Sequence, residues 1–362
     1  MSERKDRLNR REFFSKTLAG LGSASFLLTG RKASAGTHAG GPAASPAGSP
    51  AIIHRPLGKT GIRLPVVNMG VMNADNPDLV RRSFELGVRH FDTAESYARG
   101  RNEEMVGTVI QELKARDRVV IATKISIGGV RRAASAPAEI KSVFLNRFEG
   151  CLKRLKTDYV DVLYLHNVQS VEDIRDPGFT AALAQLKKEK KARFAGFSAH
   201  GNMTELLNEA ARGGFYDVLL VAYNYAMAED AELEMALRGA AGRGIGLIAM
   251  KTQCAQYWYR DDYVPKEKQG LYSGVHQTAV LKWALRNDYI SCAVPGYTTF
   301  AQMEEDFSVA RDLDLTPDEK KFLESRSVRL ALAYCVQCRK CLKTCPAAAD
   351  VPSLMRAHLY AS

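Results

Sequence analysis

Short apolar runs alternate with longer amphipathic runs along most of this 362-residue chain. The short runs have four to seven residues, and most carry Val or Ile, as strands buried in a parallel sheet do. They lie at 66–71, 88–91, 119–123, 159–165, 192–197, 217–221, 245–249 and 290–294. Helical patterns separate them, for example at 103–114, 137–155 and 203–212, and 299–311 follows the last run. Eight such units over about 250 residues predict a (β/α)8 TIM barrel, an α/β fold.

The flanking segments place the ends of this barrel. No G-x-G-x-x-G follows the first short run, which weighs against a doubly wound dinucleotide-binding sheet. Residues 53–64 predict a β-hairpin that turns at 59–61, ahead of the first strand, where it can cover the barrel floor. Helical patterning at 317–334 would join the barrel to the C-terminal residues. We therefore expect the barrel over 52–315 and a C-terminal extension over 316–362.

The first 35 residues predict an export signal. Residues 1–16 are charged and contain the pair Arg10-Arg11, an apolar stretch covers 17–30, and an A-x-A site ends at Ala35. These three parts in this order are typical of a bacterial signal peptide, and the paired arginines resemble the twin-arginine class. The prediction is export of the folded chain by the twin-arginine machinery to the periplasm, with cleavage after Ala35. The alternative is a disordered basic tail with a chance apolar run.

The charge of the chain is concentrated in that segment. The net charge is +11, and residues 1–35 hold eight Lys or Arg and three acids, so their removal leaves +6. Residues 36–51 are mainly Gly, Ala, Ser and Pro without charge, which predicts a disordered linker. The moderate remaining charge argues against a nucleic-acid partner and suits an anionic dinucleotide. No apolar run reaches 18 residues, so we expect no integral membrane protein after cleavage.

Polar residues follow three neighbouring predicted strands. The second strand runs into Asp92 and then Tyr97, the third into Lys124 and the fourth into His166. TIM barrels gather their chemistry at these carboxyl ends. A lysine ammonium stabilises a phenolate, so a nearby tyrosine becomes a better proton donor, and a histidine can orient a carbonyl. Singly, each residue is more often structural, as part of an ion pair or as a satisfied core group.

In five segments the chain resembles the aldo/keto reductase family. The segments that carry the resemblance are FDTAESYARGRNEEMVG (91–107), IATK (121–124), DYVDVLYLHNV (158–168), GFSAHG (196–201) and AVPGYTTFAQMEED (293–306). The resemblance spans roughly residues 53–312. It implies hydride transfer between NAD(P)H and a small-molecule carbonyl substrate.

The same resemblance implies roles for single residues. Tyr97 would be the general acid, Lys124 and Asp92 its tuning partners, and His166 the group that orients the carbonyl. The residues that would contact the cofactor follow the fifth to eighth strands. They are Ser198 and Asn224 near the nicotinamide carboxamide, Lys251 toward the phosphates, and Pro295 and Gly296 before the helix at the adenosine phosphate.

Two departures from the family pattern leave the cofactor preference open. Ala199 and His200 stand where the family often has Asn after the carboxamide serine. Residues 297–306 contain three acids and no Lys or Arg, which are the usual partners of the additional phosphate of NADP. A further loop at 252–275 carries four aromatic residues and is either a lid over the site or a loop packed on the barrel surface. Those aromatic residues are Tyr257, Trp258, Tyr259 and Tyr263.

A second redox signal lies near the C-terminus. Cys335, Cys338, Cys341 and Cys345 precede Pro346, a C-x2-C-x2-C-x3-C-P run typical of a [4Fe–4S] cluster in bacterial ferredoxins. Zinc sites usually have a longer spacer, and disulfides are the alternative in an oxidising compartment. No second run is present, so Cys345 closes this cluster, or a distant ligand does, or the site is degenerate. A subset of aldo/keto reductases looks similar, with a ferredoxin-like tail.

These observations favour an NAD(P)H-dependent carbonyl reductase whose C-terminal cluster is coupled to the barrel or stabilises it. One alternative is an electron-transfer protein whose barrel holds a nicotinamide cofactor and whose cluster exchanges electrons with a redox partner protein. Another is a sensor that retains the cofactor without turnover. Free NAD(P)H is not expected to be regenerated outside the cytoplasm. A tightly bound cofactor that is reduced through the cluster would reconcile NAD(P)H-dependent activity with export.

Overall fold

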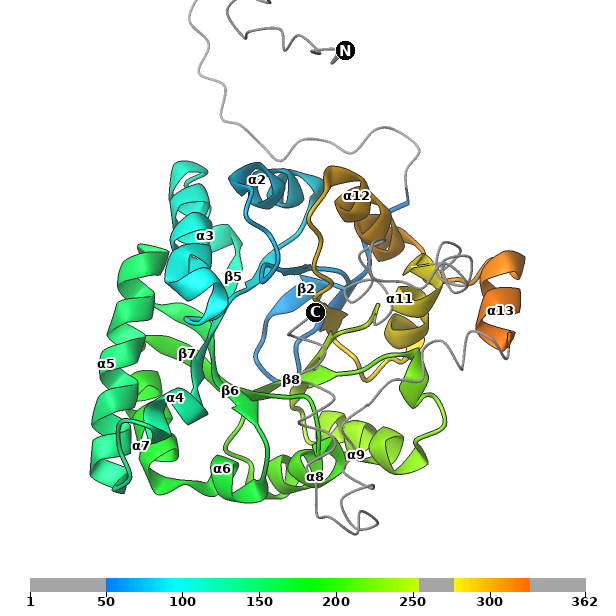
Figure 1. Ribbon diagram of the computed structural model, residues 1–362. Helices are drawn as coiled ribbons and strands as arrows, with labels where there is room; N and C mark the ends of the chain where they lie inside the picture. Colours follow the sequence, from blue (N-terminus) through cyan, green and yellow to red (C-terminus); the bar gives the residue numbers. More distant parts are fainter. Residues whose placement is uncertain (1–49, 254–276, 326–362) are drawn as a thin grey trace, which may run out of the picture. The chain divides into compact units, whose positions relative to one another are not determined.

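The protein folds as an eight-stranded parallel barrel surrounded by helices, as the computed structural model shows over residues 50–253 and 277–325 (Figure 1). The strands are neighbours in chain order, and the first and last meet through a parallel bridge between Val67 and Ala293. They are β3 (Met69–Gly70), β4 (His90–Asp92), β5 (Val120–Ser126), β6 (Val160–Val168), β7 (Ala192–Ala199), β8 (Val218–Ala222), β9 (Gly246–Met250) and β10 (Cys292–Ala293). All eight predicted strands are present, so the TIM-barrel prediction is confirmed.

Helices cover the outside of this sheet, as the view along the barrel shows (Figure 1). The longer ones are α2 (Pro77–Leu86), α3 (Arg101–Glu112), α5 (Pro137–Leu155), α7 (Pro177–Lys188), α8 (Met203–Gly213), α9 (Ala231–Gly242), α11 (Gln277–Arg286) and α12 (Phe300–Ser308). Shorter ones are α4 (Ile127–Arg131), α6 (Val171–Arg175) and α13 (Pro317–Glu324), with 3-10 turns η1 (Tyr97–Gly100), η2 (Arg116–Arg118), η3 (Tyr225–Met227) and η4 (Val309–Arg311).

Helix α5 shows how the sequence pattern builds this layer. Pro137 occupies the first turn, where its missing N–H costs no hydrogen bond, and Lys156 ends the helix in a left-handed conformation. Ile140, Phe144 and Phe148 recur at helical spacing and are buried against the barrel and α7. Burial of each phenylalanine contributes about 1.5–3 kcal/mol. This buried face fixes the rotation of α5 about its axis.

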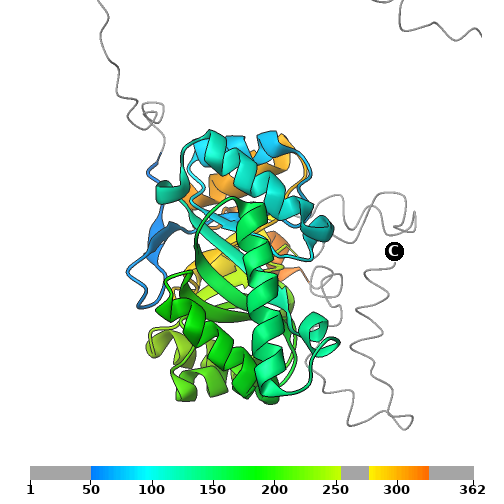
Figure 2. The same ribbon diagram turned by 90° about the vertical axis from the view of Figure 1, so that its left-hand side faces the viewer.

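The predicted hairpin is present and covers the barrel floor. Strands β1 (His54–Pro56) and β2 (Arg63–Pro65) pair antiparallel and lie at one end of the barrel (Figure 2). The amide of Lys59 donates to the carbonyl of Gly244 at 2.8 Å, just before β9 begins. A Cβ on Gly246 would lie 2.6 Å from the side chain of Leu57, so the hairpin packs directly on the start of β9.

The predicted helix at 317–334 is present over Pro317–Glu324, and its residues 326–334 lie outside the described residues. Helix α13 ends at Glu324, and Ser325 is extended, with its N–H donating to the carbonyl of Phe322 at 3.1 Å. A short closing turn of this kind ends a helix without a left-handed residue. Among the described helices, none is long and apolar enough to traverse a lipid bilayer.

Candidate active site

Two neighbouring strands, β4 and β5, and the turn after β4 bring Asp92, Lys124 and Tyr97 into contact. Lys124, on β5, pairs with the carboxylate of Asp92, which ends β4. The same ammonium donates to the carbonyl of Thr93 at 2.7 Å and to the hydroxyl of Tyr97 at 3.3 Å. Lys124 is 1% exposed and Asp92 is 4% exposed, so the ion pair lies inside the protein. The sequence prediction that these residues converge is confirmed geometrically.

The charge state of Lys124 follows from these contacts. Burial alone would lower the pKa of Lys124, but the negative charge of Asp92 and the hydroxyl of Tyr97 outweigh it, and the pKa is raised. The lysine therefore stays protonated over the physiological pH range. Its positive charge stands beside the oxygen of Tyr97, where it stabilises negative charge on that oxygen.

His166 faces Tyr97 from the next strand. Their ring centroids are 5.8 Å apart with an interplanar angle of 84°, an edge-to-face arrangement. His166 lies where the β6–β7 register shifts, between Leu165 and Val168, and Asn167 adopts a left-handed conformation with φ of 65°. A bulge re-aims the side chains next to it, so this irregularity sets the direction of His166.

A narrow cavity of about 50 Å³ lies between the first two and last two barrel strands. It contains Asp92 and Tyr97 together with three of the predicted cofactor residues, Lys251, Pro295 and Gly296. Its other lining residues are Gly70, Met72, Asn73, Met250, Thr252 and Val294. Met72 and Asn73 were not predicted from the sequence, although they follow the first barrel strand as Asp92 follows the second. Strand-end position was therefore a usable signal.

Ser198 and Asn224 lie at neighbouring strand ends but do not line this cavity. Ser198 is buried on β7, and its hydroxyl accepts the backbone N–H of Asn167 at 2.9 Å. Asn224 follows β8 and is fully buried, and its side-chain oxygen accepts the N–H of Ala226 at 3.0 Å, which caps η3. Both residues thus stabilise the loops around the barrel mouth in the described structure.

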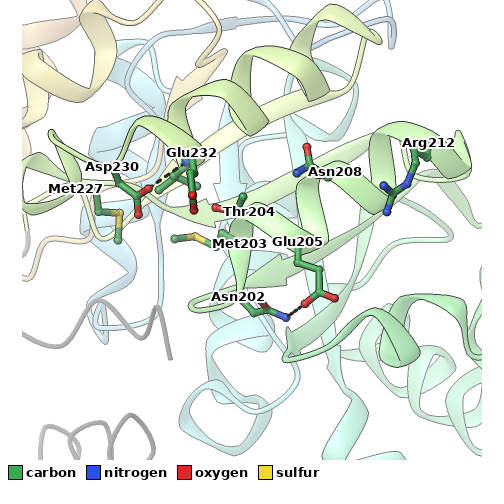
Figure 3. A pocket seen from close by; sticks show the side chains of 10 residues that line it. Asn202, Met203, Thr204, Glu205, Asn208, Arg212, Met227, Asp230 and Glu232 are labelled. Carbon is green, nitrogen blue, oxygen red and sulfur yellow. Dashed lines mark hydrogen bonds between the residues drawn. The ribbon is translucent and has the colours of Figure 1, made fainter. Parts of the chain in front are cut away.

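A larger groove of about 420 Å³ runs between α8 and α9, apart from the cavity that contains Tyr97 (Figure 3). Asn202 donates to Glu205 at 2.6 Å on one side, and Asp230 caps α9 through the N–H of Leu233 at 3.2 Å on the other. None of the residues that line the groove belongs to the group of Asp92, Tyr97, Lys124 and His166. Pocket size alone would therefore not select the cavity that contains Tyr97.

Several sequence predictions lie outside the described residues. These are the export signal, the linker up to residue 49, the aromatic loop residues and the cysteines of the C-terminal run. Within the described ranges, no group of three or more His, Cys, Asp or Glu side chains is arranged to hold a metal ion. The described cysteines Cys151 and Cys292 are free thiols, and burial raises both pKa values, to about 12 for Cys292.

Comparison with known proteins agrees with the fold. The model of the aldo/keto reductase family matches residues 67–270. L-galactose dehydrogenase of Arabidopsis thaliana is 26% identical over 306 residues, which cover 76% of this chain and 93% of the plant protein. The holo form of aldo-keto reductase AKR11C1 from Bacillus halodurans has a TM-score of 0.61 at 18% identity, covering 77% of this chain and all of that one.

A third similar protein was solved as a ligand complex. An aldo/keto reductase from Klebsiella pneumoniae, in complex with NADP and acetate, has a TM-score of 0.55 at 22% identity and covers 75% of this chain and 94% of its own. The likeness to both solved structures concerns the fold. The family model matches more than half of the chain, so this protein belongs to the aldo/keto reductase family. It is an NAD(P)H-dependent oxidoreductase of that type.

Proposed function

We propose that the protein reduces the carbonyl group of a small molecule, with Tyr97 as the proton donor. The observation that carries this proposal is the Lys124 ammonium, which contacts the Tyr97 hydroxyl at 3.3 Å while it is paired with Asp92. When Tyr97 gives its proton to the carbonyl oxygen, the negative charge left on Tyr97 is stabilised by Lys124. Asp92 keeps the lysine charged and holds it in place.

Residues of the cavity fit a nicotinamide nucleotide. Asp92 Oδ2 and the hydroxyl of Thr252 are buried, line the cavity region and have no hydrogen-bond partner in the described part of the protein. A ribose or amide group can satisfy both, since buried polar atoms normally have partners. Lys251 supports charge recognition, because a cation on this wall suits a phosphate. When bound, NAD(P)H supplies the hydride to the carbonyl carbon.

The other predicted residues have supporting roles in this proposal. His166 faces the Tyr97 ring and orients the carbonyl oxygen between the two side chains. Ser198 and Asn224 hold the neighbouring loops at the nicotinamide end of the cofactor, and Ser198 retains a hydroxyl proton to donate. Pro295 and Gly296 form the cavity wall that leads to α12.

Replacing Tyr97 by Phe tests the proposed acid. We expect kcat for aldehyde reduction to fall by a factor of about 10²–10⁴, the usual contribution of a positioned acid. Binding of NADPH or NADH, measured by fluorescence, should stay within a few-fold of the unmodified protein. Tyr159→Phe is the matched control, because this ring stacks on Arg116 away from the site. Nearly full activity in Tyr97→Phe would exclude this role, and loss in both variants would indicate a folding defect.

We also propose that the cysteine run at 335–345 holds a [4Fe–4S] cluster. The support is the donor set, four thiols at ferredoxin spacing followed by proline. Anaerobic purification should give iron and labile sulfide near four per chain, with bound nicotinamide measured in the same sample. Zinc or disulfide in place of iron would overturn this part. Cys338→Ser should remove electron exchange with a partner protein and spare simple aldehyde reduction.

We further propose that the folded chain is exported to the periplasm. The support is the order of the paired arginines, the apolar stretch and the A-x-A site before residue 36. Fractionation of cells that express the full chain should place a processed protein beginning near Gly36 in the periplasm. Replacing Arg10 and Arg11 by Lys should retain the unprocessed chain in the cytoplasm. A cytoplasmic, unprocessed protein in both cases would refute the prediction.

A further inference from the structure

We propose that Arg147 and Arg154 of helix α5 act together as positioning residues that fix Tyr97 against Lys124. We call this pair the α5 arginine clamp. The inference rests on the proposed role of Tyr97 as proton donor. Neither arginine is placed in the catalytic group, and each acts through a glutamate that flanks Tyr97 in the chain.

Arg147 anchors the chain just before Tyr97. It makes a two-point ion pair with Glu95, with Nε to Oε2 at 2.9 Å and Nη2 to Oε1 at 2.6 Å. The Glu95 side chain is 8% exposed. Its Oε1 also accepts the backbone N–H of Ser126 at 2.8 Å, at the end of β5. One carboxylate therefore ties the Tyr97 loop to the strand that carries Lys124.

Arg154 anchors the chain just after Tyr97. Its Nε donates to Glu103 Oε2 at 2.7 Å, and the other oxygen of Glu103 accepts the hydroxyl of Thr123 at 2.5 Å. Glu103 is fully buried. Arg154 also lies against Gly100, where a Cβ would come within 2.7 Å of its side chain. This second carboxylate ties the far side of the loop to β5, next to Lys124.

The two anchors share one helix face. Arg147 and Arg154 are seven residues apart, close to two turns of α5, so their side chains leave the helix in nearly the same direction. Glu95 and Glu103 bracket Tyr97, while Thr123 and Ser126 bracket Lys124. The buried phenylalanines of α5 hold this face toward the barrel. A single rigid helix thereby sets the separation between the tyrosine and the lysine.

The loop needs such anchors because its backbone is strained. Ala98 and Arg99 have φ of 48° and 58°, and Gly100 has φ of 89°, three successive left-handed residues directly after Tyr97. This conformation is unfavourable for residues other than glycine, and strained segments persist only where the surroundings over-determine them. Without the clamp, the loop can relax and carry Tyr97 away from Lys124.

The charges around Tyr97 define what this relaxation would change. Lys124 faces it from β5, Asp92 from β4, His166 from β6, and Lys251 lines the same cavity after β9. A longer distance from Lys124 weakens the stabilisation of the phenolate and makes the tyrosine a poorer donor. The clamp therefore affects the proton-transfer step more than cofactor binding.

Arg147→Met is the primary test, with the pH dependence of kcat as the readout. We expect kcat to fall tenfold to a hundredfold, the basic limb of the profile for carbonyl reduction to move to higher pH, and the Kd for NAD(P)H to change less than threefold. Arg147→Lys keeps the charge and loses the two-point ion pair with Glu95. Its kcat and its pH profile should therefore lie between those of Arg147→Met and those of the unmodified protein. Arg154→Met should shift the profile in the same direction.

Arg116→Met is the matched control. Arg116 pairs with the buried Asp161 at 3.0 Å, and Asp161 accepts the N–H of Ile121 at 2.9 Å at the start of β5. The chemistry and burial of this pair resemble those of the clamp, but it lies at the other end of the strand. The Arg116→Met variant should lower the melting temperature and leave the pH profile of kcat unchanged. Equal effects of Arg116→Met and Arg147→Met on the profile would overturn the clamp.

A milder variant covers the case in which Arg147→Met does not fold. Gly129→Ala places a Cβ 2.7 Å from the Arg147 guanidinium and should displace it without removing it. An unshifted pH profile in Gly129→Ala and Arg147→Lys would refute the inference. If Tyr97→Phe is inactive while these profiles are unshifted, only the clamp fails. If Tyr97→Phe is active, the proposed function itself fails.

Discussion

Lys124 and Asp92 form an ion pair that is almost wholly closed to water. Removing one partner of a buried pair leaves the other charge uncompensated. We expect Lys124→Met to lower the free energy of unfolding by about 3–5 kcal/mol, because Asp92 loses its counter-charge. The variant should also lose carbonyl reduction by a factor of about 10² or more. Denaturant unfolding and steady-state kinetics check the two effects separately.

Asp92→Asn is the companion of that variant, since it removes the negative charge and keeps the shape. If activity survives in Lys124→Met but not in Asp92→Asn, Asp92 itself and not the lysine supports the chemistry. The double variant should cost less than the sum of the two single ones, because both remove the same interaction.

Ser198 connects two strand ends at the barrel mouth. Its replacement by Ala leaves the N–H of Asn167 without its 2.9 Å partner, which costs about 0.5–1.5 kcal/mol because this hydrogen bond is only partly buried. Because Asn167 follows His166 in the bulge of β6, we expect His166 to lose its fixed direction. Substrate KM should rise several-fold, together with the Kd for the cofactor. Ser170→Ala, on the loop before α6, is a suitable control, and an equal rise of KM there would contradict this account.

Asp306 gives the stability an unusual dependence on pH. Burial raises the pKa of this carboxyl to about 7, although the hydrogen bond from Gln253 opposes the shift. A raised folded-state pKa means that the folded protein binds more protons than the unfolded chain between about pH 4 and 7, so this group's contribution to stability is lost as pH rises through that window. Asp306→Asn should therefore stabilise the protein more at pH 8 than at pH 5.

The expected gain from Asp306→Asn at pH 8 is at most about 4 kcal/mol, because each pKa unit between the folded and the unfolded chain corresponds to about 1.4 kcal/mol. Urea unfolding at both pH values measures it. A gain of the same size at pH 5 and pH 8 would show that Asp306 is not the group that titrates. Glu305→Gln is the control, because its side chain is exposed on the same helix.

The segment before and within α12 predicts the preference between the two nicotinamide cofactors. Residues 297–306 have no Lys or Arg, and Thr299 and Gln302 are already used in the capping box of α12. Exposed Glu304 and Glu305 would repel an additional phosphate. We expect kcat/KM to be higher with NADH than with NADPH. Thr298→Arg should raise the NADPH value about tenfold, as one charged hydrogen bond does, and an unmodified protein that prefers NADPH would contradict the prediction.

The strands, and the meeting of Asp92, Tyr97, Lys124 and His166 at one end of the barrel, could be predicted from the sequence because both follow from local rules. Each buried strand has its own apolar run, and Asp92, Lys124 and His166 each follow or end one. The Arg147–Glu95 and Arg154–Glu103 pairs could not be predicted, since they join residues about 50 positions apart on different elements. The bulge at Asn167 was also missed, because no Gly marks it. The break after Glu324 was not predicted, since the sequence pattern stays helical beyond that residue.

The closure of the barrel has a consequence for its motion. Strands β3 and β10 are the shortest of the eight, with two residues each, and they meet at the bridge between Val67 and Ala293. A few amides hold this seam, among them Asn68 to Ala293 at 2.9 Å and Gly70 to Pro295 at 2.8 Å. The seam borders the cavity that contains Tyr97, so local opening there widens the entrance without unfolding the barrel. We expect bound cofactor to hold this seam closed. Amide hydrogen exchange at Asn68 and Gly70 should therefore be slower with cofactor than without it.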